Sequence, residues 1–293
     1  MHKSGFVNII GNPNVGKSTL MNALVGEKLS IITSKAQTTR HRSMGIVSGE
    51  DFQIVYSDTP GILKPSYKLQ ESMMKFVTGA VTDADVILYV TDTVEQGDRS
   101  AEIIGRIRES GIPTVVVINK IDLSTPEALD ALVDKWRQEL PEAQIVPASA
   151  KENFNIEGLF KTILALLPEG PAFYPKETLT DKTLRFFASE IIREKILKFY
   201  DKEIPYCCEI EIDSYREEPT IDRIAATIYV ARDSQKGILI GHKGEKLKRV
   251  GQTAREDMEE FLGKKVFLQL FVKVSDDWRN NERQLRRFGY ELE

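Results

Sequence analysis

The feature that most constrains the fold is a glycine-rich stretch near the start of the chain, Gly11-Asn12-Pro13-Asn14-Val15-Gly16-Lys17-Ser18. It follows a short apolar run at residues 6–10 and precedes Thr19-Leu20-Met21-Asn22-Ala23-Leu24, which has the composition of a helix. A strand, a glycine turn and a helix in this order direct backbone N–H groups and the helix N-terminus toward an anion. The pattern therefore predicts an α/β domain with a phosphate-binding loop after its first strand.

Short apolar runs alternate with longer amphipathic stretches from residue 5 to about residue 167. The runs cover residues 6–10, 52–56, 86–90, 114–118 and 144–147. This alternation is typical of a doubly wound, mostly parallel sheet. The turn Ser48-Gly49-Glu50-Asp51 separates two of the apolar segments, so we expect one hairpin to add an antiparallel edge strand.

The composition changes at residues 168–175, where three prolines in eight residues predict an ordered, non-helical linker. We therefore expect a first domain at residues 1–170, a linker at 171–182 and a smaller α+β domain at 183–293. The second half reads as a series of segments: a helix at 184–199, strands at 208–213 and 224–230, a glycine-interrupted segment, a charged helix at 244–261, a strand at 266–274 and a helical tail at 278–290.

The bulk composition narrows the class of protein. The formal net charge is -4, and neither half of the chain carries an excess of positive charge, so any nucleic-acid site is expected to be a local patch. Cys207 and Cys208 are neighbours in an apparent strand, which favours two free thiols and a reducing cytoplasm. No apolar run reaches the roughly 18 to 20 residues of a membrane span. We expect a cytoplasmic, monomeric protein.

Further motifs complete a nucleotide site. Lys17 is placed to reach the β- and γ-phosphate oxygens, and the Ser18 hydroxyl to ligate Mg²⁺. In Asp58-Thr59-Pro60-Gly61, the carboxylate is expected near the metal and the Gly61 N–H against the γ-phosphate. Between these motifs lies Gln37-Thr38-Thr39-Arg40, a polar loop with a hydroxyl that could close on the metal only when the γ-phosphate is present.

The choice of base follows from Asn119-Lys120-Ile121-Asp122, directly after an apolar run. A carboxylate at Asp122 accepts from both the ring N1–H and the exocyclic amine of guanine, a donor pair that adenine lacks. The Lys120 stem can cover the base, and Ser149-Ala150-Lys151 fits a loop whose N–H meets the guanine O6. The predicted nucleotide-binding residues are Gly11, Asn14, Val15, Gly16, Lys17, Ser18, Thr19, Asp58, Gly61, Asn119, Lys120, Asp122, Ser149, Ala150 and Lys151.

This order of five motifs resembles the Ras-like translation-factor group of P-loop GTPases across residues 5–167. One departure is that Ile62, which has no hydrogen-bonding group, follows Gly61 where many such proteins present a glutamine. We therefore expect slow unaided hydrolysis, on the order of 10⁻⁴ to 10⁻³ per second. Asn14 is similar to the asparagine that ligates K⁺ in some hydrophobic-substituted GTPases. The alternative, that Asn14 only stabilises the loop through local hydrogen bonds, stays open.

The second half carries Ile240-Gly241-His242-Lys243-Gly244 before a helix with basic residues. Small residues let a nucleic-acid backbone approach closely, and residues 232–249 contain six Lys or Arg against two acids. His242 has no acid, nucleophile or metal partner nearby in sequence, which favours a loop residue over a catalyst. A glycine turn beside a solvated charged helix would give the same pattern. The candidate RNA-binding residues are Ile240, Gly241, His242, Lys243, Gly244, Lys246, Lys248 and Arg249.

The helix and strand order of this half resembles a type II KH domain, α-β-β-α-α-β. A GTPase domain joined to such a KH domain resembles the Era family of bacterial ribosome-assembly GTPases. The resemblance includes Gln37-Thr38-Thr39-Arg40, Glu190-Ile191-Ile192-Arg193-Glu194-Lys195 and the Trp278-Arg279 tail. It implies GTP and Mg²⁺ as ligands, the 3′ end of 16S ribosomal RNA and the 30S subunit as partners, and tighter RNA binding in the GTP state.

The resemblance also assigns roles to residues of the first half. Thr39 is the switch hydroxyl, which joins Ser18 and Asp58 as the metal ligands. Lys17, Thr39, Gly61 and Asn14 are the residues assigned to hydrolysis.

Two rival functions remain open from the sequence. The first is an RNA-binding module in which GTP is a static ligand, which the lack of a hydrogen-bonding group on Ile62 favours. The second is a GTPase that acts at the membrane surface in cell-cycle control. It would bind the membrane through the basic tail, which contains Arg279, Arg283, Arg286 and Arg287.

Overall fold

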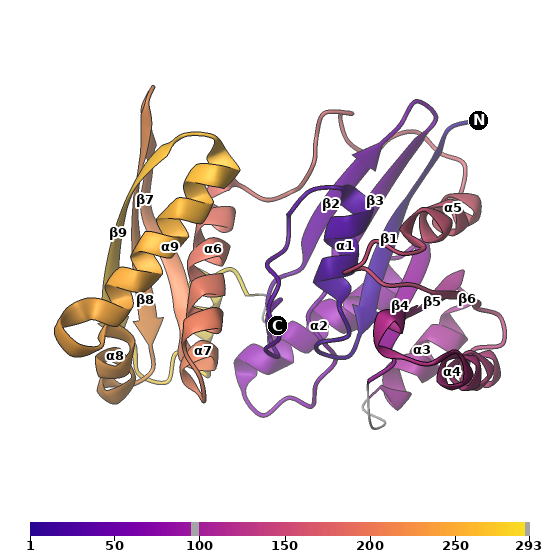
Figure 1. Ribbon diagram of the computed structural model, residues 1–293, viewed down its shortest axis with the longest axis horizontal. Helices are drawn as coiled ribbons and strands as arrows, with labels where there is room; N and C mark the ends of the chain where they lie inside the picture. Colours follow the sequence, from indigo (N-terminus) through magenta and orange to yellow (C-terminus); the bar gives the residue numbers. More distant parts are fainter. Residues whose placement is uncertain (95–99, 291–293) are drawn as a thin grey trace. The chain divides into compact units, whose positions relative to one another are not determined.

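The computed structural model describes residues 1–94 and 100–290, and the chain divides into two compact units (Figure 1). One unit comprises Met1–Pro65 and Met73–Asp181, and the other comprises Ser66–Ser72 and Lys182–Glu293. No helix in the described ranges is long and apolar enough to cross a membrane.

The first unit contains a six-stranded sheet with the order β2-β3-β1-β4-β5-β6. All neighbouring strands pair in parallel except β2 and β3, which form the antiparallel hairpin that the sequence predicts. The strands are β1 (Lys3–Gly11), β2 (Ser43–Ser48), β3 (Phe52–Asp58), β4 (Val86–Asp92), β5 (Thr114–Asn119) and β6 (Gln144–Pro147). Every residue of β4 and β5 is buried, as expected for central strands covered on both faces. The predicted doubly wound fold is confirmed.

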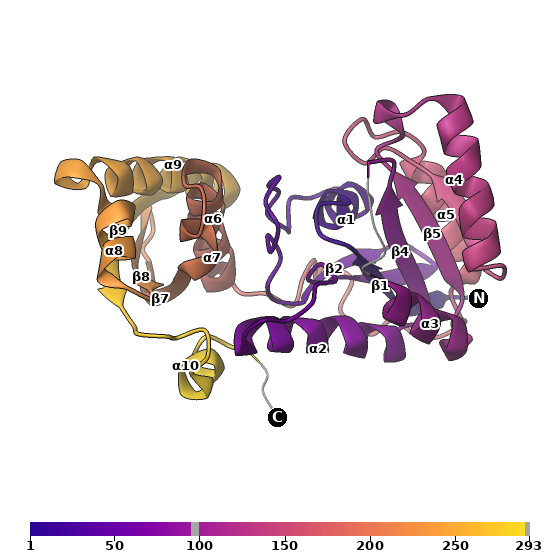
Figure 2. The same cartoon turned by 90° about the horizontal axis from the view of Figure 1, so that it is seen from below.

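Helices cover both faces of this sheet (Figures 1 and 2). Buried side chains of α2, α3 and α4, among them Val77, Ile103 and Trp136, pack on one face, and α1 and α5 contact each other over the other. The helices are α1 (Lys17–Val25), α2 (Lys68–Thr82), α3 (Ala101–Ser110), α4 (Pro126–Glu139) and α5 (Ile156–Leu166). The carboxyl ends of β1 and β3 are neighbours, so the loops that follow them meet at one edge.

The second unit has three strands in the order β7-β8-β9, antiparallel between β7 and β8 and parallel between β8 and β9. Its elements are α6 (Leu184–Phe199), α7 (Ile204–Cys207), β7 (Glu209–Glu217), β8 (Ile221–Val230), α8 (Asp233–Ile240), the 3₁₀ turn η2 (His242–Gly244), α9 (Glu245–Leu262), β9 (Lys265–Val274) and α10 (Glu282–Arg287). Figure 2 shows α6 and α9 on one side of the sheet. Ile192 and Ile196 of α6 and Val250 of α9 are fully buried against the inward residues of the strands. The predicted KH architecture is confirmed.

One local prediction for this unit is wrong. Cys207 lies in the short helix α7 rather than in a strand, because Pro205 occupies its first turn and the strand begins only at Glu209. The thiols of Cys207 and Cys208 both contact the Ile204 carbonyl, at 3.3 and 3.1 Å, instead of pointing to opposite faces. Neither cysteine forms a disulfide within the described residues, as expected.

The C-terminal tail folds onto the second unit. The Trp278 side chain is fully buried, and its Nε1–H donates to the Cys207 carbonyl at 2.9 Å. The Tyr290 hydroxyl donates to Glu209 at 2.7 Å, and the Arg287 guanidinium donates to both carboxylate oxygens of Glu211. Of the four tail arginines, Arg287 is therefore engaged within the protein itself. Arg286 also contacts Glu282 at 3.7 Å, and Arg279 lies 4.7 Å from the Tyr67 ring centre.

The two tryptophans provide a matched test of this anchor. The buried Nε1–H of Trp136 has no hydrogen-bond partner within the described residues, whereas that of Trp278 has one. Trp278→Phe should lower the free energy of unfolding of its unit by about 1–3 kcal/mol more than Trp136→Phe lowers that of the first unit, since only the former orphans a buried carbonyl. Urea unfolding followed by circular dichroism measures both variants. Equal losses would contradict the anchoring role of the Trp278 hydrogen bond.

Candidate nucleotide site and nucleic-acid surface

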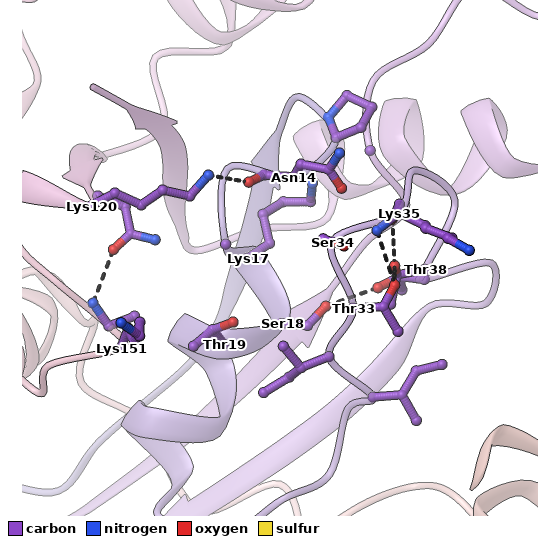
Figure 3. A pocket seen from close by; sticks show the side chains of 18 of the residues that line it. Asn14, Lys17, Ser18, Thr19, Thr33, Ser34, Lys35, Thr38, Lys120 and Lys151 are labelled. Atoms are coloured by element: carbon purple, nitrogen blue, oxygen red, sulfur yellow. Dashed lines mark hydrogen bonds between the residues drawn. The ribbon is translucent and has the colours of Figure 1, made fainter. Parts of the chain in front are cut away.

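A cavity of about 800 Å³ opens where the loops after β1, β3 and β5 meet, a size typical of small-ligand sites. Its walls come from the glycine-rich loop, the segment 31–39, the segment 119–123 and the loop at 150–151. Figure 3 shows Lys17 and Ser18 between Lys120 and Lys151 on one side and Thr33, Lys35 and Thr38 on the other. Four of the predicted nucleotide-binding residues do not line the cavity: Gly11, Val15, Asp58 and Ser149.

The glycine-rich loop has the geometry that phosphate binding requires. The Lys17 ammonium donates to the carbonyls of Gly11 and Asn12 at 3.0 and 2.8 Å, which holds it at the loop. Gly16 has φ 95°, and a Cβ there would lie 2.3 Å from the Asn119 amide nitrogen. Only glycine meets both constraints.

Three side-chain oxygens converge beside this loop. The Ser18 hydroxyl lies 2.9 Å from the Thr39 hydroxyl and donates to Asp58 Oδ2 at 2.7 Å, and Thr39 Oγ1 is 3.1 Å from the same carboxylate oxygen. Asp58 is fully buried, and its other oxygen, Oδ1, has no hydrogen-bond partner in the described part of the chain. Burial raises the pKa of the Asp58 carboxyl, while the Ser18 hydrogen bond and the Lys17 charge oppose that shift.

This donor set suits Mg²⁺, which prefers oxygen ligands and is usually held by one or two carboxylates plus phosphates. The orphaned Asp58 Oδ1 and the two hydroxyls are the oxygens that would hold such an ion. Thr38 is excluded from this cluster, because its hydroxyl bonds to Thr33 and to the Lys35 carbonyl, both at 2.6 Å. The structure therefore brings Thr39, and not Thr38, to Ser18 and Asp58.

Two residues that the sequence motifs do not include hold the ends of the Thr39 loop. At its start, the Asn22 side chain of α1 accepts from the N–H groups of Leu29 and Ser30 and donates to the Ser30 carbonyl, at 2.8–3.0 Å. At its end, the Arg42 guanidinium donates to Ser57 and to Asn8 and pairs with Asp83. Segment 31–41 lies between these two anchors. No spacing rule in the sequence pairs Arg42 with partners as distant as Asn8 and Asp83.

The region expected beside the γ-phosphate is tightly packed. A Cβ on Gly61 would lie 2.8 Å from the Pro13 backbone, so the loops approach closely there. The Ile62 N–H donates to the Gly11 carbonyl at 3.1 Å, while its side chain is only 3% exposed and packs in the core with Ile10 and Val77. Ile62 therefore points away from the cavity and cannot orient a water molecule.

Asn14 takes a left-handed conformation, with φ 66°. Its carbonyl accepts from the Lys120 ammonium at 2.6 Å (Figure 3). Its side chain is exposed at the cavity and makes no hydrogen bond within residues 1–94 and 100–290. The local hydrogen bonds that would make Asn14 a purely structural residue are thus made by its backbone and not by its amide.

The base-binding end is organised by Asn119, which is almost fully buried. Its amide nitrogen donates to the Val15 carbonyl at 2.8 Å, and its oxygen accepts from the Ala150 N–H at 3.0 Å, so one side chain ties the glycine-rich loop to the loop at 149–151. The Asp122 carboxylate accepts from the Ser149 hydroxyl at 2.6 Å and lines the cavity.

Lys120 lies between these two loops. Besides the Asn14 carbonyl, it contacts Asp92 at 2.5 Å. Asp92 ends β4 and belongs to none of the sequence motifs. Thr19 and Lys151 line the cavity, as predicted for ligand-binding residues.

The second unit presents its glycine turn between α8 and α9. Gly244 has φ 79°, a left-handed conformation that glycine favours, with open space around it. His242 and Lys243 are exposed, Gly241 and Ile240 are partly exposed, and Lys248 is exposed on α9. Two more basic residues of α9 stack on aromatic rings at the end of α6: Arg249 lies 4.3 Å from the Phe199 ring centre and Lys246 lies 5.9 Å from that of Tyr200. All eight candidate RNA-binding residues thus gather at one end of this unit.

Comparison with known proteins agrees with this division. Residues 6–120 match the family model described as 50S ribosome-binding GTPase, and residues 203–279 match the KH domain model. The chain is 45% identical to GTPase Era of Alkaliphilus metalliredigens over 99% of both chains, and 44% identical to GTPase Era of Staphylococcus haemolyticus over 99% of this chain and 97% of the relative. The chain belongs to the Era family of GTPases.

Solved Era structures match over the full length. A crystal structure of Era in complex with MgGDPNP and nucleotides 1506–1542 of 16S ribosomal RNA superposes with a TM-score of 0.95 at 41% identity and full coverage of both chains. Era of Aquifex aeolicus bound to GDP and AlF4⁻ also matches with a TM-score of 0.95 and 41% identity, over 99% of this chain and all of that one. The Era-family architecture of a GTPase unit and a KH unit therefore applies to the whole chain.

The Asp122 geometry leads to a test of base selectivity. An amide at this position replaces one acceptor oxygen with a donor and so matches the exocyclic carbonyl of xanthine instead of the amine of guanine. Asp122→Asn should lose GTP binding by 100-fold or more, on the order of 3 kcal/mol for a buried mismatched polar pair, and gain XTP binding. Competition binding with GTP, XTP and ATP measures this. Unchanged guanine preference would remove Asp122 from the base-reading role.

Proposed function

We propose that this chain is a GTP-dependent switch that binds the 3′ end of 16S ribosomal RNA through its KH unit and assists assembly and maturation of the 30S subunit. The observation that carries the proposal is the full-length match to an Era structure that holds MgGDPNP and 16S nucleotides. Within that framework, residues 1–170 act as the GTPase domain, 171–182 as the linker and 183–293 as the KH domain with its tail.

In the GTP state, the Lys17 ammonium exchanges its loop carbonyls for phosphate oxygens, and the Gly61 N–H faces the γ-phosphate. Ser18, Thr39 and Asp58 would hold Mg²⁺, which would supply positive charge to the phosphates. Thr39 contacts the metal only while segment 31–41 is closed. Loss of the γ-phosphate would then remove the contacts that hold segment 31–41 closed, and the segment would be released.

We also propose that Asn14 supplies a ligand for K⁺. Its amide is free of protein hydrogen bonds among the described residues and faces the cavity, and Ile62 leaves the reaction without a side chain that could orient water. A monovalent cation beside the phosphates would add positive charge where it develops in the transition state.

Exchange of the salt tests this proposal. GTP hydrolysis should be at least 10-fold faster in KCl than in NaCl of equal ionic strength, about 1.4 kcal/mol of transition-state stabilisation. Asn14→Ala should abolish the difference and leave the rate in NaCl unchanged. Equal rates of the wild-type protein in both salts would exclude K⁺ as a cofactor.

The switch itself is tested by RNA affinity. RNA of nucleotides 1506–1542 should bind more tightly to protein loaded with GDPNP than with GDP, by at least fivefold, about 1 kcal/mol of coupling. Lys243→Glu should weaken binding in both states because it sets a carboxylate against the phosphates, whereas Lys161→Glu makes the same charge change in the first unit and should not. Equal affinity in the two nucleotide states would instead favour GTP as a static ligand.

A further inference from the structure

The sheet of the KH unit has a second face, which the helices leave uncovered. On β9, the even-numbered residues from Val266 to Val274 pack toward α6 and α9, while the odd-numbered residues point the other way. That outer row consists of Lys265, Phe267, Gln269, Phe271 and Lys273. Phe267 and Phe271 are 44% and 50% exposed, although phenylalanine is among the residue types most often buried in proteins. We call this row, together with Arg223 of β8, the β9 aromatic face.

The tail covers only part of this side of the sheet. The Phe288 ring, just after α10, packs on Tyr229 at 5.3 Å, and Tyr229 lies opposite Lys273 in the strand register. Further along the strand, β8 offers only Thr227 and Ala225 beside Phe271 and Gln269. The two phenylalanine rings therefore remain open, on a strand that is at the edge of its sheet.

Charge around the rings favours a polyanion. The Arg223 guanidinium lies 5.4 Å from the Phe267 ring centre, and lysines stand at both ends of the row. Arg223 pairs with Glu218 at 3.0 Å and Lys265 with Glu259 at 3.3 Å, but such exposed pairs are weak and leave the cations able to meet phosphates. Lys273 has no ion-pair partner in the described ranges.

Apart from Glu218 and Glu259, the carboxylates on this side of the sheet lie away from the row. The outward carboxylates Glu209, Glu211 and Asp213 are on β7, and β8 separates them from β9. Tyr290 and Arg287 already bind Glu209 and Glu211, and Asp213 accepts from the Thr227 hydroxyl at 2.7 Å.

The length of the RNA held by a related protein points to the occupant. A G-x-x-G loop clamps about four nucleotides of a single strand. The Era structure at 41% identity contains nucleotides 1506–1542, many more than that loop can engage. Lysines at both ends of an edge strand also disfavour pairing with a second copy of the same strand, which would bring like charges together.

We infer that the β9 aromatic face is a second single-stranded RNA surface, on which bases stack against Phe267 and Phe271 while Arg223, Lys265 and Lys273 contact phosphates. Successive aromatics on one face of a strand accept bases without regard to their identity, because every base has a π-face. This face therefore adds affinity for RNA that continues beyond the G-x-x-G turn. The inference depends on the RNA-binding function proposed above.

Substitutions at Phe271 separate stacking from simple apolar contact. With protein loaded with GDPNP, and labelled RNA of nucleotides 1506–1542 followed by fluorescence anisotropy, Phe271→Ala should raise the Kd by about 5- to 150-fold, the range for loss of one stacked base. Phe271→Trp should retain the wild-type Kd, and Phe271→Leu should behave like Phe271→Ala. Phe261→Ala, a substitution of a 42% exposed ring on α9, is the matched control and should leave the Kd unchanged.

Three other results of this experiment would each lead to a different conclusion. An unchanged Kd for Phe271→Ala, with Lys243→Glu still defective, would overturn the second surface and leave the proposed function intact. Full binding by Phe271→Leu would show that the face is merely apolar and would assign it to a protein partner instead of RNA. Failure of the wild-type protein to bind this RNA at all would overturn the proposed function and this inference together. Circular dichroism and GTP hydrolysis of each variant confirm that the fold is intact.

Discussion

The oxygens of Ser18, Thr39 and Asp58 meet within 3.1 Å of one another and join three loops that are distant in sequence. The parallel pairing of β1 with β3 makes this meeting possible, since it places the ends of both strands at one edge of the sheet. A buried carboxylate with one unpartnered oxygen is costly unless a cation or donor satisfies it. The fold of the first unit thus sets up a site whose stability depends on what binds there.

Closure over this site depends on two anchors. Asn22 fixes the start of the segment 31–41 with three hydrogen bonds, and Arg42 fixes its end to the sheet and to Asp83, just after α2. A loop tied at both ends loses less conformational entropy on closing than a free one. Thr39 can therefore reach the metal position through a local rearrangement, with the flanking strands in place.

Much of the fold and of the nucleotide site could be predicted from the sequence, because the patterns that determine them are formed by neighbouring residues. The glycine-rich loop, the strand periodicity and the KH element order each rest on neighbouring residues, and the structure has all three. Arg42 and Asp92 were missed because their partners are distant in sequence and become neighbours only in the fold. Asn22 was missed although its partners Leu29 and Ser30 are close in sequence, because it belongs to none of the nucleotide-binding motifs. The strand predicted at Cys207 was wrong because Pro205 starts a helical turn that periodicity alone does not reveal. The burial of Ile62 could likewise not be read from its position after Gly61.

The most direct test of the central claim is amide hydrogen exchange across residues 25–45, with the protein bound to Mg²⁺ and either GDPNP or GDP. The account predicts that segment 31–41 exchanges at least 10-fold more slowly with GDPNP, about 1.4 kcal/mol of added protection, while Leu29, Ser30 and Ser43 at its anchored ends change little. Equal protection of segment 31–41 in the two nucleotide states would contradict closure that depends on the γ-phosphate.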